Sequence, residues 1–519
     1  MAVVKTRTTK SLLAYVGQTV FMVVTVIGGF LATPLLIRLM GTERFGIFRI
    51  LNDWMANLAL LELGLGGAIA VTLIPAVNDE DDEKAAVTLN EGFRACSSIG
   101  ALMLAGALLL AVVLPWILPH NQVGSMEIRL AVAAISVTLV TFPASVFRTL
   151  FEVRQQGYLI SMLLTGQSLI TLGLQLAAAS LKLGLPGVAL ATALGQSLTL
   201  IVLTYKALRI YPRFWKSPPS NDVKKRLWSV NVAIFVNKTM GRIGLYSDNV
   251  IVGNTLGAAA VSSFFLTQRV ATTAQTQLQA IGNASWAGLM DLAQRGESER
   301  FQSRLVELTS IVSGLGLAAL GTVSLLNPYF FLKWMGPKLY AGNAVNTLVC
   351  LSAWLWSVQS LWGWPIDASG NSKRPLPYAI ASAALNLSVS IAATKLLGMQ
   401  GPIIGTITAF LCIQSWSMPK ILNQVFQVRQ TQIVAAALRP LTWGIPHWLV
   451  WKTLVASFPP NNWRLLITHA LLMGGSGLLL WWRFTCTEEY RHLWSARLRY
   501  LIPQTLPNLS RSKASPTHP

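Results

Sequence analysis

The residues of this sequence that could do chemistry are polar and charged side chains inside strongly apolar segments. The clearest set follows helical spacing across residues 230–252 and consists of Asn231, Lys238, Arg242, Tyr246 and Asn249. Lys238 and Arg242 are one helical turn apart, with no acidic residue beside them on that stripe. Two such cations attract an anion, and a guanidinium can hold two phosphate oxygens at once. The stripe therefore predicts a site for a dense anionic group such as a diphosphate.

The same stripe has an alternative interpretation that needs no ligand. Lys238 can extend its ammonium group to the membrane surface, and Arg242 can pair with an acid on a neighbouring helix. We expect Arg242 to face a water-filled path, because an ionisable side chain inside a membrane usually faces a cavity or a partner. For Lys238 both alternatives stay open.

A second polar set occupies residues 259–288. Its members are Gln268, Arg269, Thr272, Thr273, Thr276, Gln279 and Asn283. Arg269, Thr272, Thr276 and Asn283 fall on one helical face, with Asn249 of the preceding segment as a further candidate contact. So dense a set of hydroxyl and amide groups predicts a hydrated wall that contacts a polar substrate. Hydrogen bonds between helices are the alternative.

Acidic residues in apolar segments form the third group. Arg49 and Asp53 stand at i and i+4 with Asn57 on the same stripe, and we expect the two charges to neutralise each other, whether or not they also line the path. Glu62 lies among small residues, where a carboxylate is either a proton or sodium site or a hydrogen-bonded structural acid. The same two alternatives apply to Asp248 and Asp367.

The segments that carry these side chains are long enough to cross a membrane. The chain has 519 residues, of which 53% are hydrophobic and 12% charged, whereas soluble proteins carry about 25% charged residues. Apolar runs of about 20 residues predict an all-α polytopic membrane protein with about fourteen transmembrane helices. The expected spans are 13–36, 46–73, 92–118, 128–150, 158–181, 185–207, 230–252, 259–288, 305–326, 344–366, 376–397, 400–421, 432–454 and 463–483.

The formal net charge of +21 could by itself indicate nucleic acid as a partner. Its placement argues against that: with a cytoplasmic N-terminus, most basic residues fall in inside segments, and only the loop at 79–83 is acidic. This positive-inside bias predicts a multi-pass protein of the cell (inner) membrane with both termini cytoplasmic. The basic loops should also attract anionic membrane lipids.

Cysteine and histidine residues are scattered without metal-ligand spacing, so neither a disulfide framework nor a metal site is expected. We find no nucleotide-binding loop, Ser/His/Asp set or paired catalytic carboxylates, and we expect a protein that is not an enzyme and needs no cofactor. Transport by such a chain would depend on an H⁺ or Na⁺ gradient, on the membrane potential or on consumption of the product.

Two short sequences repeat about 215 residues apart and divide the chain in half. Leu183-Gly184-Leu185-Pro186-Gly187 with Thr192 corresponds to Leu397-Gly398-Met399-Gln400-Gly401 with Thr406, and Met40-Gly41 with Phe48 corresponds to Leu256-Gly257 with Phe264. The repeat predicts two pseudo-symmetric six-helix bundles related by an axis along the membrane normal. We expect a first lobe at 1–207, a basic linker at 208–228, a second lobe at 229–425, two extra transmembrane helices at 426–483 and a basic cytoplasmic tail at 484–519.

The chain resembles a known family over about residues 10–425. Leu39-Met40-Gly41-Thr42-Glu43-Arg44-Phe45-Gly46-Ile47-Phe48, followed by Leu61-Glu62-Leu63-Gly64-Leu65-Gly66-Gly67-Ala68-Ile69, is similar to the opening of the bacterial polysaccharide-transporter flippases, the O-antigen and capsule-unit translocases of the multidrug/oligosaccharidyl-lipid/polysaccharide exporter superfamily. Met40, Phe45 and Glu62 depart from the Leu, Tyr and Asp usual there. Residues 242–253 resemble that family's entry into the second bundle.

The resemblance implies an alternating-access transporter. The implied substrate is a polyprenyl-diphosphate-linked oligosaccharide, moved between leaflets for polysaccharide, lipopolysaccharide or exopolysaccharide biosynthesis, with a polysaccharide polymerase and other assembly proteins as further candidate partners. A cation-coupled multidrug antiporter of the same superfamily, a membrane polymerase or ligase, and a non-transporting assembly scaffold are the alternatives. An antiporter would favour net acid in its cavity, and a polymerase would need a large outer loop.

Overall fold

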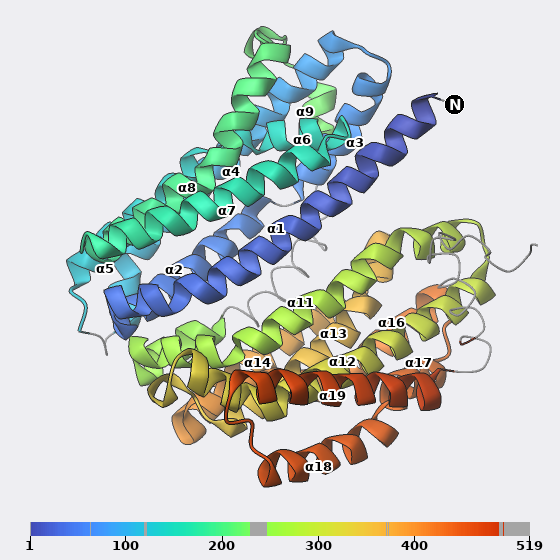
Figure 1. Ribbon diagram of the computed structural model, residues 1–519. Helices are drawn as coiled ribbons and strands as arrows, with labels where there is room; N and C mark the ends of the chain where they lie inside the picture. The colour runs from blue at the N-terminus through green and yellow to red at the C-terminus, as the bar shows by residue number, and fades with distance from the viewer. Residues whose placement is uncertain are drawn as a thin grey trace, which may run out of the picture.

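The computed structural model describes residues 2–62, 64–118, 122–228, 247–369, 371, 373–486 and 491, and every regular element within these ranges is helical (Figure 1). The expected all-α polytopic fold is confirmed. One face of α1 carries the exposed apolar side chains of Val16, Val20, Val23 and Ile27, at helical spacing. Such a stripe is typical of a helix that faces lipid.

The N-terminal half forms the first lobe, in which α1 packs along α7, α7 along α8, and α8 along α5. Its elements are α1 (Ala2–Met40), α2 (Thr42–Leu58), η1 (Ala59–Glu62), α3 (Leu65–Asn78), α4 (Asp82–Ile117), α5 (Ser125–Val140), η2 (Phe142–Ala144), α6 (Ser145–Val153), α7 (Gly157–Ser180), α8 (Gly184–Ile210), η3 (Phe214–Lys216) and α9 (Asn221–Trp228).

The second lobe follows residue 246, and α11, α12 and α13 pack against one another at its centre. Its elements are a helical segment at 247–256, α11 (Ala258–Gln294), α12 (Ser298–Trp334), η4 (Pro337–Leu339), α13 (Asn343–Ala368), α14 (Leu376–Leu397), η5 (Gly398–Gln400), α15 (Gly401–Ala409), the π-helical η6 (Phe410–Gln414), α16 (Ser415–Phe426), α17 (Gln430–Leu438), α18 (Leu441–Ser457), α19 (Trp463–Leu480) and the π-helical η7 (Trp481–Thr485).

Nine helical stretches among the described residues are long and apolar enough to cross a membrane. They account for ten of the expected spans, because 376–397 and 400–421 merge into one stretch, Leu376–Phe426. The four other expected spans behave differently. The span at 230–252 falls largely outside the described residues, that at 259–288 is the long polar helix α11, and those at 46–73 and 432–454 are interrupted.

The expected continuous helix at 46–73 is wrong. The helix stops after Leu58, tightens into the short turn η1, and restarts at Leu65 after Gly64, whose φ of 75° lies in the left-handed region. Glycine adopts this conformation without the steric cost that a Cβ brings. Pro143, in η2, likewise separates α5 from α6, whereas Pro34 and Pro365 lie inside α1 and α13 without ending either helix.

The two sequence repeats correspond to matching backbone turns. Gly41, before α2, has φ 83° and ψ 161°, and Gly257, before α11, has φ 91° and ψ 163°. Gly184 and Gly398, which lie at equivalent positions in the other repeated motif, both have a φ of 65°. The two halves therefore use the same turn conformations at equivalent positions, as expected for a pseudo-symmetric pair of bundles.

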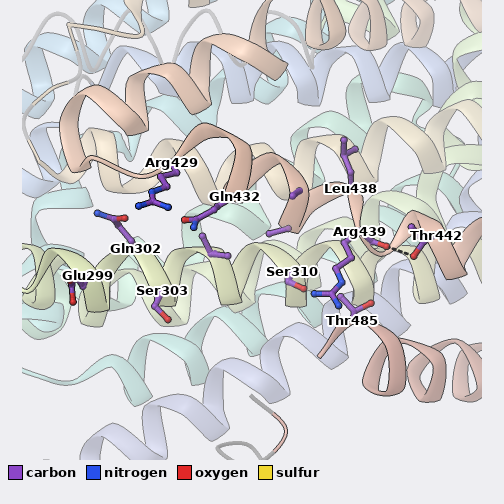
Figure 2. A pocket seen from close by; sticks show the side chains of 13 residues that line it. Glu299, Gln302, Ser303, Ser310, Arg429, Gln432, Leu438, Arg439, Thr442 and Thr485 are labelled. Atoms are coloured by element: carbon purple, nitrogen blue, oxygen red, sulfur yellow. Dashed lines mark hydrogen bonds between the residues drawn. The ribbon is translucent and has the colours of Figure 1, made fainter. Parts of the chain in front are cut away.

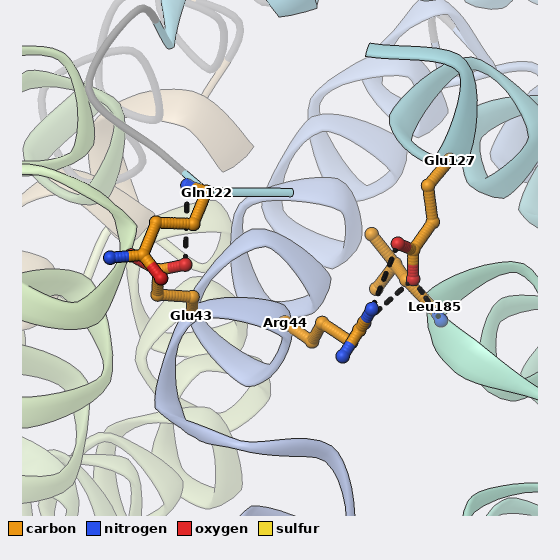
Figure 3. A network of polar contacts seen from close by, with 5 residues as sticks. All are labelled: Glu43, Arg44, Gln122, Glu127 and Leu185. Carbon is orange, nitrogen blue, oxygen red and sulfur yellow. Dashed lines mark hydrogen bonds and ion pairs between the residues drawn. The ribbon is translucent and has the colours of Figure 1, made fainter. Parts of the chain in front are cut away.

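The start of α2 is tied to two other helices of its own lobe (Figure 3). Arg44 donates from Nε to Oε1 of Glu127 at 2.7 Å and from Nη2 to Oε2 at 3.1 Å. The same Glu127 accepts the backbone N–H of Leu185 at 3.0 Å, and Glu43 accepts the backbone N–H of Gln122 at 3.2 Å. This network joins the starts of α2, α5 and α8.

Helices α17, α18 and α19 pack on the outside of the second lobe against α12. The Trp481 ring fills the space above Gly314, where a Cβ would overlap it. Ser313 donates to the backbone carbonyl of Ala437 at 2.6 Å, and Trp448 donates to Ser324 at 2.7 Å. These contacts hold the appended helices firmly on α12.

Candidate functional site

The two lobes meet where α2 crosses the start of α11. Ser262 donates to the backbone carbonyl of Thr42 at 2.5 Å, and a Cβ on Gly46 would overlap the carbonyl oxygen of Ala258. Both pairs obey the repeat offset of 216 residues, because Thr42 corresponds to Ala258 and Gly46 to Ser262. The contact is therefore reciprocal, as two equivalent surfaces on a pseudo-twofold axis require.

Hydrophobic packing continues across this contact. Phe48, Ile50 and Leu51 of α2 belong to the same buried cluster as Val261 and Phe264 of α11. A second cluster, around Phe147 and Phe151, lies within the first lobe. The lobe contact is thus part of a hydrophobic core rather than a loose surface contact.

A buried polar group lies directly beside the contact, centred on Asp53. Asp53 has a relative exposure of 1%. Its Oδ1 accepts from Nη2 of Arg49 at 2.6 Å, within α2, and its Oδ2 accepts from Nδ2 of Asn249, in the other lobe, at 2.5 Å. The Arg49–Asp53 pair that the i, i+4 spacing predicts is present, and it also connects the lobes through Asn249.

A second polar link runs the other way across the contact. Arg269 of α11 donates from Nη1 to the hydroxyl of Thr33 in α1 at 2.9 Å. Thr33 in turn donates to the backbone carbonyl of Gly29 at 2.6 Å. Arg269 is therefore held against the first lobe instead of projecting free from α11.

The two arginines share an aromatic surface. The guanidinium of Arg49 lies 4.3 Å above the centre of the Phe265 ring, and that of Arg269 lies 5.7 Å from the same ring and 4.9 Å from Phe30. The face of an aromatic ring is negative, so it stabilises a cation where water is scarce. We call Thr33, Arg49, Asp53, Asn249, Phe265 and Arg269 the lobe-contact cluster.

The lobe-contact cluster consists of three pairs of equivalent positions. Thr33 corresponds to Asn249, Arg49 to Phe265 and Asp53 to Arg269, each at the offset of 216 residues. Asn249 donates to Asp53, and Arg269 donates to Thr33, so the same two positions bond across the axis in both directions. Both halves therefore keep a hydrogen bond between these two positions. At one of the two positions, however, the first half has an acid, Asp53, and the second half has a base, Arg269.

Several polar atoms in and beside this cluster are buried without a hydrogen-bond partner among the residues that the structure describes. They are Nε of Arg49, Oδ1 of Asn57, Oγ of Ser247, Oδ1 of Asp248 and Oδ1 of Asn249. Buried polar atoms are normally satisfied, and those that are not mark places where a water, an ion or a second conformation completes the bonding. Asp53 and Asp248 also interact electrostatically. Two carboxylates and an amide oxygen are suitable groups for a proton or a small hard cation.

Beyond Arg269, the polar face of α11 leaves the lobe contact. Thr272, Thr276 and Asn283 are exposed, and α11 borders the first lobe's α1 at one end and diverges from it toward the other (Figure 1). The threonine hydroxyls bond carbonyls of their own helix, from Thr272 to Arg269 at 3.1 Å and from Thr276 to Thr272 at 2.9 Å. These hydroxyls keep their oxygen lone pairs available to solvent or to a polar ligand.

Apart from Thr272, Thr276 and Asn283 on α11, the predicted site residues fall into three groups. Asn231, Lys238, Arg242 and Tyr246 lie outside the described residues, and so does the side chain of Asp367. Arg49, Asp53, Asn249 and Arg269 come together at the lobe contact, with Asp248 beside them. Glu62 lies elsewhere, within the first lobe, where it faces Gly66 and acts electrostatically on Cys96.

Three members of the site were missed in the sequence: Thr33, Phe30 and Phe265. Threonine and phenylalanine are ordinary residues in a membrane helix, so type alone does not single them out. The repeat offset could have found two of them, since it pairs Thr33 with Asn249 and Phe265 with Arg49.

A family model described as "Polysaccharide biosynthesis protein" matches residues 16–287, which is more than half of the chain. The chain belongs to this polysaccharide biosynthesis family. The match takes in the first lobe from residue 16 onward and the lobe-contact cluster, and the family expected from the Leu39–Phe48 and Leu61–Ile69 motifs is confirmed. A search of curated proteins found no match.

Solved structures place this family member in a known fold. A structure described as "Lipid II flippase MurJ, inward closed conformation" aligns with a TM-score of 0.64 at 12% identity, over 95% of this chain and 99% of that one. An inward-facing multidrug resistance MATE family transporter of the MOP superfamily aligns at 0.59 and 15%, over 85% and 99%. An outward-facing MATE structure aligns at 0.54 and 13%, over 86% and 96%. The TM-scores and coverage show that the chain shares the fold of these polytopic membrane proteins.

Proposed function

We propose that this protein is a flippase that moves a polyprenyl-diphosphate-linked oligosaccharide from the cytoplasmic to the outer leaflet of the cell membrane. The observation that carries the proposal is the lobe contact itself. Every hydrogen bond between the lobes that involves only described residues lies at the same end of the molecule. The first lobe contributes residues 30–53 and 117 to these bonds, and the second lobe contributes residues 249–269 and 334. A two-lobed membrane protein that is joined at one end is suited to alternating access.

Family membership supports the chemical class of the substrate. A polysaccharide biosynthesis family is consistent with a glycan carried on a lipid, and the MurJ structure, named as a lipid II flippase, shares the fold. The glycan and diphosphate would cross between the lobes while the lipid tail remains in the bilayer. The appropriate orientation has both termini in the cytoplasm, as the positive-inside bias predicts.

We assign the substrate contacts as follows. Arg242 and Lys238 would bind the diphosphate, because the sequence gives these cations no acid on their own stripe. Thr272, Thr276 and Asn283, which are exposed on α11, would form the hydrated wall past which the sugars move. Arg49, Asn249 and Arg269 would join the substrate path only when the lobe contact opens, since in this conformation they bond to Asp53 and Thr33.

Opening the lobe contact requires Asp53 to release Asn249, and this suggests a role for the nearby acids. We propose that Asp53 and Asp248 bind a proton or Na⁺ in one of the two states, which would couple transport to an ion gradient. The Oδ1 atoms of Asp248 and Asn249, which are buried and have no hydrogen-bond partner within the described ranges, support this assignment. Glu62 lies in a separate part of the first lobe, so its proposed role as a coupling acid rests on the sequence alone.

A cation-coupled multidrug antiporter is the second candidate function, favoured by the MATE structures that share the fold. The composition of the lobe-contact cluster argues against it, since Arg49 and Arg269 outnumber Asp53. An antiporter for cationic drugs would need a net acidic path. A scaffold that does not transport is the third candidate. In a scaffold the charged side chains of the lobe-contact cluster would have no role in moving a substrate.

The deciding experiment measures lipid-linked oligosaccharide by leaflet in cells depleted of this protein, with a glycan probe that does not cross membranes. The proposal expects intermediates to accumulate on the cytoplasmic side while their synthesis continues. Re-expression of the wild type should restore export, and Arg242→Ala should reach the membrane without restoring it. Normal arrival of the intermediates in the outer leaflet would reject the flippase proposal.

A further inference from the structure

A cavity of about 880 Å³ lies far from the lobe contact, between the start of α12, helix α17 and η7 (Figure 2). Its lining combines apolar surface with polar side chains, and the polar residues used below are Ser310, Arg429, Gln432, Arg439, Thr442 and Thr485. Nothing in the proposed transport path requires it, because it lies on the outer side of the second lobe, where α17 covers α12.

Two arginines dominate the charge of this cavity. Arg429 precedes α17 and Arg439 follows it, and both are exposed. In the part of the chain that the structure describes, neither guanidinium has a hydrogen bond or ion pair, whereas Arg295, Arg300 and Arg304 nearby are each paired with an acid one turn away. Among the described residues of the lining, the acid is Glu299, which Figure 2 shows at the opposite end from Arg439.

The walls of the cavity are fixed by the surrounding contacts. Ser313 holds α17 on α12 through the carbonyl of Ala437 at 2.6 Å, and Trp443 donates to Thr485 at 2.6 Å. Arg439 points toward Thr485 and Ser310 in Figure 2, on the side of α17 that faces α12. The cavity therefore is an organised space between anchored elements, with a cation at each end of α17.

The position of the cavity relative to the bilayer limits what can occupy it. It lies where the hydrophilic start of α12, from Ser298 to Arg304, gives way to its apolar part, and where α19 ends in η7. This is the level at which phospholipid headgroups meet a membrane protein, and basic pockets between helices at that level bind anionic headgroups. A guanidinium contacts phosphate oxygens in a bidentate manner, and hydroxyl and amide groups bond a headgroup's glycerol.

We propose that this cavity binds the phosphate of an anionic membrane phospholipid, through Arg429 and Arg439, with Gln432 and Thr442 beside it. Because α17 has nine residues, Arg429 and Arg439 are ten positions apart and are separated by about 15 Å along the helix axis. One phosphodiester can contact only one of them, so the site takes two singly charged headgroups or one headgroup with two phosphates. The acyl chains would lie along the exposed apolar side chains of α18 and α19, such as Leu449 and Leu471.

Lipid retention by the purified full-length protein tests this inference without any transport readout. Native mass spectrometry should show up to two retained phosphatidylglycerol molecules, and about tenfold weaker retention of phosphatidylcholine, whose headgroup carries no net charge. The double variant Arg429→Gln, Arg439→Gln should reduce phosphatidylglycerol retention to the phosphatidylcholine level. Arg213→Gln, which removes an exposed arginine of the linker between the lobes, is the matched control and should retain lipid as the wild type does.

Two further measurements identify the source of the phosphate and keep the test valid if the double variant misfolds. Sodium diphosphate should not raise the thermal midpoint as phosphatidylglycerol does; equal stabilisation would show a site for soluble phosphates and overturn the lipid assignment. Gln432→Trp fills the cavity, keeps both arginines and should also reduce retention. Wild-type retention of phosphatidylglycerol in both the double variant and Gln432→Trp would overturn the proposal.

Discussion

Helices α2 and α11 are equivalent parts of the two lobes, yet they carry opposite charges at one pair of equivalent positions, Asp53 and Arg269. Both follow a glycine of positive φ, Gly41 or Gly257, and both carry a phenylalanine at the next equivalent position, Phe48 or Phe264. One turn later the first lobe has Asp53 where the second has Arg269. Each of these residues bonds to the first helix of the other lobe, through Asn249 and Thr33.

The difference shows how a duplicated fold can hold itself together at its own axis. Two identical acids at positions 53 and 269 would repel each other across the contact, and two identical bases would do the same. With one of each, both hydrogen bonds of the lobe-contact cluster that cross between the lobes join a charged group to a neutral one, so that these two bonds break without separating a full ion pair. A contact of that kind can be both specific and reversible.

The strongest test of this comparison is to add a side chain at its centre. Gly46→Leu places a Cβ onto the carbonyl oxygen of Ala258, which is backbone and cannot move aside. Overpacking of this kind costs about 1–3 kcal/mol or more, so we expect export to fall by at least about tenfold. The leaflet assay measures export, and cysteines introduced at Thr42 and Ser262 should lose their ability to cross-link.

Gly67→Leu is the matched control for that variant, because nothing lies within 4 Å of a Cβ at Gly67. Export at the wild-type rate in both leucine variants would mean that the α2–α11 contact does not take part in transport.

The next largest effect should come from Asp53. Asp53→Ala leaves Arg49 and Asn249 without their shared acceptor, and we expect a loss of about 2 kcal/mol of stability, at the low end for a broken buried pair because Arg49 is 32% exposed. Asp53→Asn keeps an oxygen that can accept from Asn249 but cannot exchange a proton. If Asp53 couples transport to an ion gradient, Asp53→Asn should restore the thermal midpoint and leave gradient-driven export as low as in Asp53→Ala. Wild-type export in Asp53→Asn would limit Asp53 to a structural role.

A smaller effect is expected on the other side of the axis. Thr33→Val removes the acceptor of Arg269 while preserving shape, and Arg269→Gln removes the guanidinium that lies over Phe30 and Phe265. A double-mutant cycle on thermal stability should give a coupling of about 1 kcal/mol between the two positions. Additive single effects would show that the hydrogen bond contributes nothing to the lobe contact. Thr192→Val offers a comparison, since Thr192 accepts from Gln175 within one lobe.

The smallest expected effect concerns the second pair of equivalent glycines. Gly184→Ala and Gly398→Ala both place a Cβ at φ 65°, which costs about 1 kcal/mol. At Gly184 the Cβ would also come within 2.9 Å of Oε1 of Glu127, whereas Gly398 has open space. Gly184→Ala should therefore lower the thermal midpoint more than Gly398→Ala. The reverse order would show that Glu127 moves aside easily and that only backbone strain matters.

The sequence predicted most of the helices because length and apolarity are local properties. It failed at residues 46–73, where the apolar character continues although α2 ends at Leu58 and Gly64 has a φ of 75°. Hydropathy does not record a positive φ, so the break was hidden. The turn conformation that Gly41 and Gly257 share could be predicted from the sequence, because the repeated motif includes the glycine itself.

The candidate site was less predictable than the fold. The Arg49–Asp53 pair follows from local spacing, but the bond from Asn249 to Asp53 joins positions 196 residues apart. Helical periodicity gives the face of a helix and not the helix that it meets. Arg429 and Arg439 escaped notice for another reason: on the sequence Arg429 is one more basic residue of an expected loop and Arg439 lies within the expected span 432–454. Only the packing of α17 on α12 makes them line one cavity.

The length of α11 has a mechanical consequence for the proposed cycle. The helix extends 25 residues past Arg269 to Gln294, or about 38 Å at the usual helical rise. It acts as a lever arm whose pivot is the lobe contact, so a rotation of about 10° there displaces the far end by about 7 Å. A tilt small enough to be absorbed at the glycine turns thus opens the distant end by roughly the width of a sugar ring, and a modest hinge is sufficient for a bulky cargo.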